Sequence, residues 1–263
     1  MEAEIWKYSG GSDPIHRLET IYSERFWVSA GDTDPQQRLS LPTLTAKIID
    51  VATIHANRLG IGNPDMPSPS MGWVLSRLTI DMTRYPAINS YFRLSTWIED
   101  WNRFFSSRCF CIEDDEGKVL GYARSVWMVI DTATRRNAGL SALSLPEELI
   151  CRKPCPIPHQ EKHQPIDARP AAVYRFKYCD LDAYRHVNTV RYVQLLLNQY
   201  PLEAYDSGAV ARLELSFLHE AVYGETVEII HKDPALLLQS ADSSKPILYA
   251  RILFNPLSPE HIT

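Results

Sequence analysis

One stretch of the chain occurs twice, and this internal duplication limits the possible folds more than any other feature. The first copy spans residues 26–52 and the second spans residues 174–200. In each copy, a loop with two aspartates precedes an amphipathic helix. The aligned residues are Asp32 with Asp180, Asp34 with Asp182, and Arg38 with His186. A repeat of this kind predicts two structural units of one design.

Each copy carries signals for the start and the end of its helix. In the first copy, Ser40 is a good N-cap, Pro42 suits the first turn and Gly60 can end the helix. In the second copy, Asn188 is the expected N-cap and Pro201 marks the end. Apolar residues recur at helical spacing between these boundaries. The sequence therefore predicts one amphipathic helix in each copy.

Alternating apolar and polar residues follow each helix and predict antiparallel strands. The expected strands lie at residues 77–83, 90–99, 104–113 and 119–130 in the first copy, and at residues 212–218, 224–231, 234–240 and 246–254 in the second. Each half is thus a long helix packed on a curved antiparallel sheet, an α+β arrangement. We expect the two sheets to pair edge to edge, as in a homodimer, but within one chain.

A proline-rich segment separates the two copies. Six prolines between residues 140 and 172 disfavour regular structure across most of that stretch. The predicted organisation is an N-terminal domain over residues 1–139, a linker over residues 140–172 and a C-terminal domain over residues 173–263. The linker is expected to let the second domain dock on the first.

Composition limits the partners and the compartment. A formal net charge of −5 argues against non-specific nucleic-acid binding. No apolar run reaches the roughly 18 residues of a membrane span, and the first residues lack the pattern of a secretory signal. Five cysteines in no regular framework fit a reducing compartment, so a cytoplasmic location is expected. Their spacing does not match a zinc site, and neither a metal nor a cofactor is expected.

Three segments resemble the acyl-acyl-carrier-protein thioesterases of plant plastids and bacteria. These segments are residues 97–108, 125–136 and 180–192. The resemblance covers roughly residues 20–135 and 173–232, without the plastid transit peptide. It implies a tandem double hotdog fold and, in fatty acid biosynthesis, the hydrolysis of fatty acyl-acyl carrier protein to free fatty acid and holo-carrier protein. The implied partner is acyl carrier protein (ACP).

The resemblance also implies which residues catalyse the reaction. In this family, aspartate, asparagine and histidine alternate in the loop before the second helix, and an acidic residue follows further along. Asp182, His186 and Glu220 match these positions, whereas Tyr184 stands where the family has asparagine. Ala221 occupies the position of a cysteine found in many plant members, so a cysteine–histidine mechanism is untenable.

Thioester hydrolysis needs a carboxylate as nucleophile or general base, a proton-transfer group and a donor for the developing oxyanion. Asp182 and Glu220 are the candidate carboxylates, and His186 is the candidate proton-transfer group. Asp182 is expected on a loop, His186 at the start of the second helix and Glu220 on a distant strand. The backbone N–H groups at the start of the second helix could bind the oxyanion. Tyr184 and Asn188 are possible assisting residues, with packing and helix capping as their simpler roles. Direct attack by a carboxylate and activation of water both remain open.

The first copy lacks the chemistry of the second. Arg38 replaces the histidine and stays protonated near neutral pH, so it cannot act as a base. We therefore expect a non-catalytic first domain, in which Asp34 and Arg38 form an ion pair. The family is understood to bind the acyl chain in this domain. The candidates for chain binding, which could equally be ordinary core residues, are Ile48, Ala52, Trp73 and Leu75.

A basic surface is expected to dock the acidic carrier protein. Its candidate residues are Arg135, Arg136, Arg152, Lys153 and Arg191. Three alternatives stay open: a hotdog thioesterase for acyl-coenzyme A, a non-catalytic acyl-binding protein that Tyr184 makes plausible, and a hotdog hydratase or dehydratase. The aspartate–histidine order favours a thioesterase over the last of these. Acyl chain length cannot be predicted, and a monomer and a homodimer are both compatible with the sequence.

Overall fold

All strands belong to one large antiparallel sheet. The computed structural model describes residues 20–143, 145–151 and 153–256. The strand order is β1-β3-β4-β5-β2-β8-β11-β10-β9-β7, and the short β6 pairs with β5. The first half contributes β1 (Ile21–Trp27), β2 (Met71–Met82), β3 (Tyr91–Trp101), β4 (Ser106–Asp114), β5 (Val119–Asp131) and β6 (Arg136–Asn137). The second half contributes β7 (Pro170–Arg175), β8 (Gly208–Phe217), β9 (Thr226–Lys232), β10 (Ala235–Ser240) and β11 (Pro246–Pro256).

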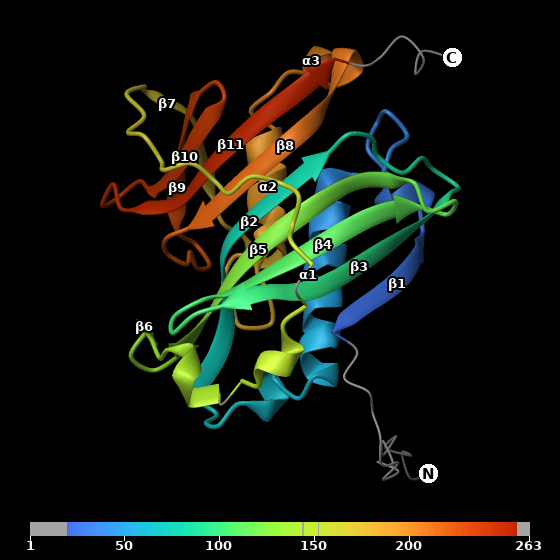
Figure 1. Cartoon of the computed structure of the whole chain (residues 1–263). Coiled ribbons are helices and arrows are strands. Elements are labelled where there is room, and N and C mark those ends of the chain that lie inside the picture. The colour runs from blue at the N-terminus through green and yellow to red at the C-terminus, as the bar shows by residue number, and fades with distance from the viewer. Residues whose placement is uncertain (1–19, 144, 152, 257–263) are drawn as a thin grey trace, which may run out of the picture.

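The two halves meet where β2 pairs with β8, at the centre of the sheet. The register of this pair places Thr79 opposite Glu214 and Ile80 opposite Leu213. Both residue pairs are buried, so the junction is part of the interior rather than an exposed strand edge. The predicted edge-to-edge pairing within one chain is confirmed, and with it the double hotdog fold (Figure 1).

The helices cover one face of this sheet (Figure 1). Helix α1 (Leu41–Arg58) and helix α2 (Thr189–Leu197) pack against each other, and a short α3 (Leu202–Ser207) follows α2. The predicted caps are confirmed. The Thr43 N–H donates to the Ser40 hydroxyl (3.3 Å), and the Val190 N–H donates to Asn188 Oδ1 (2.9 Å).

Two details of the second helix differ from the prediction. Helix α2 ends at Leu197, before Pro201, and α3 follows it. The Tyr205 hydroxyl donates to the Leu197 carbonyl (2.6 Å), so a side chain from α3 satisfies a carbonyl at the end of α2. No sequence pattern predicts a hydrogen bond of this kind between two helices.

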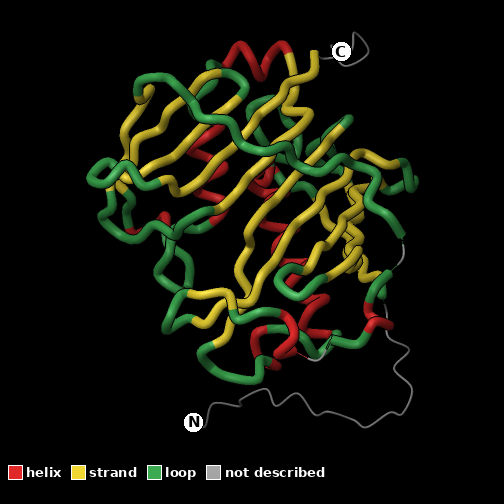
Figure 2. Tube along the Cα trace, turned by 60° about the vertical axis from the view of Figure 1, so that its left-hand side comes forward, coloured by secondary structure: helices red, strands yellow, loops and turns green. Residues whose placement is uncertain are grey.

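The segment between the halves runs across the sheet face opposite the helices (Figure 2). It begins with two short 3₁₀ turns, η3 (Leu140–Leu143) and η4 (Glu147–Leu149). Gln160 Nε2 donates to the carbonyls of Leu78 and Leu215, each at 3.0 Å, and thus bridges β2 and β8. The segment therefore covers the junction of the two halves. The division into domains at residues 139 and 173 stays a prediction.

The main hydrophobic core lies between the helices and the sheet and includes residues from both halves. Leu44 and Ile48 of α1, Val193 and Leu196 of α2, and Leu213 and Leu215 of β8 are fully buried in it. A continuous core of this kind ties the halves together through the hydrophobic effect. Among the described residues, no helix is long and apolar enough to cross a membrane.

Candidate active site

The loop before α2 is a narrow turn that brings Asp182 and His186 together. The Asp182 N–H donates to the His186 carbonyl (2.8 Å), and the Arg185 N–H donates to the Asp182 carbonyl (3.0 Å). Arg185 adopts a left-handed backbone conformation, with φ of 67°. Just beyond the turn, the Asn188 N–H donates to the Asp180 carbonyl (2.8 Å), which joins the turn to the helix start.

The two oxygens of the Asp182 carboxylate have different environments. Oδ1 accepts hydrogen bonds from the backbone N–H groups of Tyr184 (2.8 Å) and His186 (3.1 Å). Within the part of the chain that the structure describes, Oδ2 accepts none. One oxygen is thus fixed by the backbone, and the other is available to a substrate or a water molecule.

Glu220 reaches the same site from the connection after β8. Glu220 was predicted to lie on a strand, which is wrong, because β8 ends at Phe217. The Val187 N–H donates to the Ala221 carbonyl (2.9 Å) and holds this connection beside the loop. Glu220 Oε2 lies 3.5 Å from His186 Nε2. The structure therefore brings together the three residues predicted to be catalytic.

Arg135, from the first half, completes this group of charges. Its Nη2 contacts Glu220 Oε2, the same oxygen that faces His186. Arg135 was predicted only as a docking candidate, because no local signal relates it to a carboxylate 85 positions away. The threonine–arginine–arginine segment that carried the family resemblance did contain it, but with no assigned partner.

The first copy has the same backbone turn with a different outcome. The Asp34 N–H donates to the Arg38 carbonyl (2.8 Å), and Gln37 is left-handed with φ of 59°. Arg38 Nε lies 3.2 Å from Asp34 Oδ2, which confirms the predicted ion pair. The oxygen that is available in Asp182 is therefore occupied in Asp34.

The counterpart of Glu220 in the first copy is a tyrosine. The Leu39 N–H donates to the Pro86 carbonyl (2.8 Å), as the Val187 N–H does to Ala221, so Tyr85 takes the place of Glu220. The Tyr85 hydroxyl donates to the Val210 carbonyl (2.8 Å), and burial raises the pKa of this phenol. Asp34, Arg38 and Tyr85, the counterparts of the three candidate catalytic residues, are thus used for ion pairing and packing.

Tyr184 and Asn188, the two possible assisting residues, have structural contacts. The Tyr184 side chain is 70% exposed, and its hydroxyl accepts a hydrogen bond from Asn63 Nδ2 (3.4 Å). Its backbone N–H is what holds Asp182. Asn188 is the N-cap of α2, which matches the structural role considered for it.

The four candidates for acyl-chain binding occupy two environments. Ile48 and Ala52 belong to α1 and are buried in the core, and Leu75 packs against that core. Trp73 is half-buried, and its indole Nε1 donates to the Ile61 carbonyl (2.7 Å). The Trp73 N–H donates to Asn63 Oδ1 (3.1 Å), so Asn63 links this strand to Tyr184 of the loop before α2. Their role in binding an acyl chain stays a prediction.

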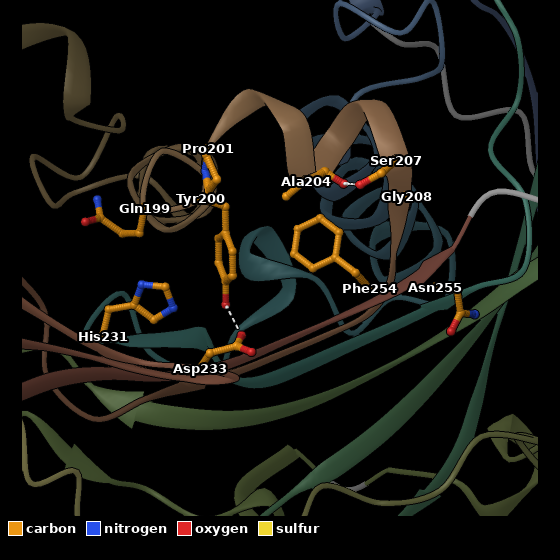
Figure 3. Close-up of a pocket in the computed structure, with 10 residues that line it drawn as sticks. All are labelled: Gln199, Tyr200, Pro201, Ala204, Ser207, Gly208, His231, Asp233, Phe254 and Asn255. Carbon is orange, nitrogen blue, oxygen red and sulfur yellow. Dashed lines mark hydrogen bonds between the residues drawn. The ribbon is translucent and has the colours of Figure 1, made fainter.

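A hollow of about 550 Å³ lies elsewhere in the second half, beside α3 (Figure 3). Tyr200 and Phe254 form an aromatic wall, and the Tyr200 hydroxyl donates to Asp233 Oδ1 (3.4 Å). The other lining residues are Gln199, Pro201, Ala204, Ser207, Gly208, His231 and Asn255. The hollow shares no residue with the Asp182–His186–Glu220 group and is therefore not the candidate active site.

Comparisons with known proteins show similarity to acyl-ACP thioesterases in sequence and in fold. The family model "Acyl-ACP thioesterase N-terminal domain" matches residues 19–142, and "Acyl-ACP thioesterase C-terminal domain" matches residues 163–250. The crystal structure of an acyl-ACP thioesterase from Bacteroides thetaiotaomicron superposes with a TM-score of 0.82 and 29% identity, over 90% of this chain and 98% of that one. The 12:0-ACP thioesterase from Umbellularia californica shares the fold, with a TM-score of 0.78 and 18% identity over 91% of this chain and 95% of that one.

Curated plant proteins are more distant in sequence. The palmitoyl-acyl carrier protein thioesterase of Gossypium hirsutum is 23% identical over 76% of this chain and 52% of its own length. The oleoyl-acyl carrier protein thioesterase of Coriandrum sativum is 24% identical over 79% of this chain and 61% of its own length. The chain thus spans between half and two thirds of the length of these relatives. Because the two family models together match most of the chain in the expected order, this protein belongs to the acyl-ACP thioesterase family.

Proposed function

We propose that this chain hydrolyses fatty acyl-ACP thioesters to free fatty acid and holo-ACP. The observation that carries the proposal is the difference between the two copies of one turn. In the second copy, Asp182 keeps an available carboxylate oxygen beside His186 and Glu220; in the first copy, Arg38 occupies the matching oxygen of Asp34. One copy has retained the groups that the reaction needs, and the other has exchanged them for structural contacts.

In the proposed reaction, the thioester C–S bond breaks and the acyl carbon gains an oxygen from water. Asp182 Oδ2 either attacks the acyl carbon, forming a mixed anhydride that water then hydrolyses, or removes a proton from the attacking water. His186 transfers a proton to the departing thiolate, which leaves as the carrier's phosphopantetheine thiol, and His186 is reprotonated by the proton that the water gives up. Glu220 faces His186 Nε2 and stabilises the imidazolium form while the proton is in transit.

The carrier protein is the proposed partner, and its docking candidates differ in how they are engaged. Arg191 donates to the Cys179 carbonyl (2.9 Å) and to Gln194 Oε1 (2.6 Å), and Lys153 lies 4.7 Å from the centre of the Trp97 ring. Arg152 lies outside the described residues. Arg136 is exposed on β6 and is the candidate that we propose contacts the acidic carrier.

We propose that the protein acts in the cytoplasm, in fatty acid biosynthesis. All five cysteines are free thiols, which suits a reducing compartment. The internal pairing of β2 with β8 already provides the two-fold arrangement that hotdog dimers build from two chains, so the proposed reaction requires no second copy.

A substrate panel tests this proposal. Free thiol release is measured with C8 to C18 acyl-ACP thioesters and with the matching coenzyme A thioesters. We expect turnover of ACP thioesters with a kcat/KM at least tenfold above that of the coenzyme A thioesters. Preference for coenzyme A would instead support the acyl-CoA thioesterase, and binding of acyl-ACP without any thiol release would support the non-catalytic acyl-binding protein.

A further inference from the structure

We infer that Arg135 is a positioning residue for this reaction, so that the active site is assembled from both halves of the chain. The inference rests on the proposed function and extends it: the first half supplies a cation that holds the Glu220 carboxylate against His186.

The Glu220 carboxylate lies between the side chains of Arg135 and His186. Glu220 Oε2 is contacted by Arg135 Nη2 on one side and lies 3.5 Å from His186 Nε2 on the other. The Glu220 side chain is 38% exposed and belongs to a connection without regular structure. Burial therefore does not immobilise it, and among the described residues no other cationic side chain pairs with it. Its orientation depends on these two partners.

The turn that carries Arg135 is held in place by hydrogen bonds to Asp131. Asp131 Oδ1 accepts hydrogen bonds from the Thr134 N–H (2.7 Å), the Thr134 hydroxyl (2.9 Å) and the Ala133 N–H (3.1 Å). The Ser70 hydroxyl donates to Asp131 Oδ2 (3.3 Å), and the Arg135 N–H donates to the Asp131 carbonyl (2.7 Å). The backbone beneath Arg135 is thus held by five hydrogen bonds to one residue.

Arg135 itself has a left-handed backbone conformation. Its φ is 59°, in the left-handed region that glycine and asparagine adopt most readily. Residues in this conformation persist where the surrounding structure holds them, and they concentrate at functional sites. The hydrogen bonds of the turn hold Arg135 in this conformation, in which its side chain contacts Glu220.

Such a cation suits the chemistry of the site. When His186 accepts or releases a proton, its charge changes, and the Glu220 carboxylate must stay aligned to stabilise it. The planar guanidinium beside the carboxylate opposes its charge and restricts its rotation. Lysine offers a point charge without this geometry, so it should replace arginine only in part.

Arg136 is a matched control for Arg135. It is the next residue, carries the same charge and is exposed on β6, where it pairs with Asp131 in the sheet. Removing either arginine changes the net charge of this surface by the same amount. Only Arg135 contacts Glu220, so only its removal should alter the chemical step rather than the encounter with the carrier.

The test measures kcat and KM with an acyl-ACP substrate for Arg135→Met, Arg135→Lys, Arg136→Met and Arg135→Gly. We expect Arg135→Met to lower kcat about 100-fold with KM changed less than about threefold, a size typical of lost acid–base assistance. Arg135→Lys should recover part of this loss, whereas Arg136→Met, which removes the proposed contact with the carrier, should act on KM. Glycine tolerates the left-handed backbone, so Arg135→Gly should fold and should regain kcat when methylguanidine is added.

A Glu220→Gln background separates positioning from every other role. If Arg135 acts through Glu220, adding Arg135→Met to Glu220→Gln should lower kcat less than threefold further. Full additivity of the two changes, or a rise in KM with kcat intact, would overturn the inference and leave Arg135 as a docking residue. If the wild-type protein releases thiol and Arg135→Met equals it, the inference alone fails. If the wild-type protein releases no thiol from any thioester, the proposed function fails and the inference with it.

Discussion

Arg38 places its Nε atom 3.2 Å from Asp34 Oδ2, in the same backbone turn that leaves the matching oxygen of Asp182 without a hydrogen bond among the described residues. Arginine in place of histidine therefore fills the carboxylate oxygen that the second turn leaves available. Arg38 also donates to the carbonyls of Gly208 (3.2 Å) and Tyr205 (3.4 Å), which lie in the second half. The first turn thus helps to hold the two halves together.

We expect Arg38→Met to lower stability without changing the chemistry. The change removes the ion pair with Asp34 and both contacts to the second half, which should reduce the free energy of unfolding by about 2 kcal/mol. Urea unfolding provides the measurement. Activity per folded molecule should stay within about twofold of wild type; a large loss of kcat would contradict the structural role of this turn.

The Tyr184 side chain should contribute little to catalysis, although it stands at a functional position of the family. Its backbone N–H holds Asp182, and this contact survives any substitution except proline. We therefore expect Tyr184→Ala to keep kcat within about threefold of wild type, since general acid–base groups contribute far more. Steady-state kinetics with acyl-ACP decides the question, and a 100-fold drop in kcat would mean that the phenol takes part in the reaction.

Gln160 should stabilise the junction between β2 and β8. Besides its bonds to Leu78 and Leu215, its Nε2 donates to Thr79 Oγ1 (3.1 Å) and its Oε1 accepts from the Ser216 hydroxyl (2.8 Å). Gln160→Ala leaves these partly buried groups without their partner and should cost about 2 kcal/mol of unfolding free energy. Gln160→Glu should be at least as costly, because a carboxylate cannot donate to the two carbonyls. Unchanged urea midpoints for both variants would show that the linker does not stabilise the junction.

Glu99 should make stability depend on pH in acid solution. Burial tends to raise the pKa of Glu99, but hydrogen bonds from Arg124 and from the Cys155 N–H outweigh burial and leave the pKa below its ordinary value. A lowered pKa in the folded state means that this stabilisation is complete above the unfolded pKa, about 4.3, and is lost as pH falls through the folded value. Glu99→Gln should therefore be less stable at neutral pH and should lose less stability between pH 5 and pH 3. Equal slopes in the two proteins would contradict this assignment.

Local patterns in the sequence were sufficient for much of the fold. Ser40 and Asn188 were predictable as caps because a capping side chain acts within three residues of itself. The edge-to-edge pairing of the two sheets followed from the duplication, since two like sheets can share an edge. The loop with Asp182 and His186 was found because both residues lie in one short motif.

The features that could not be predicted depend on contacts between residues that are far apart in the chain. Arg135 meets Glu220, and Gln160 bridges Leu78 and Leu215, across separations that no local pattern encodes. Glu220 was assigned to the wrong element, because β8 ends three residues before it. These contacts all lie between elements, where the folded topology rather than propensity brings residues together.

The most direct test of the account compares Asp182→Asn with Asp34→Asn in thiol release from acyl-ACP. Each change removes the same charge from the same backbone turn, once in each half. The account predicts that Asp182→Asn lowers kcat by about 1,000-fold or more, while Asp34→Asn leaves kcat within about threefold of wild type and only reduces stability. Equal losses of kcat in the two variants, or retained activity in Asp182→Asn, would contradict the claim that catalysis belongs to the second turn alone.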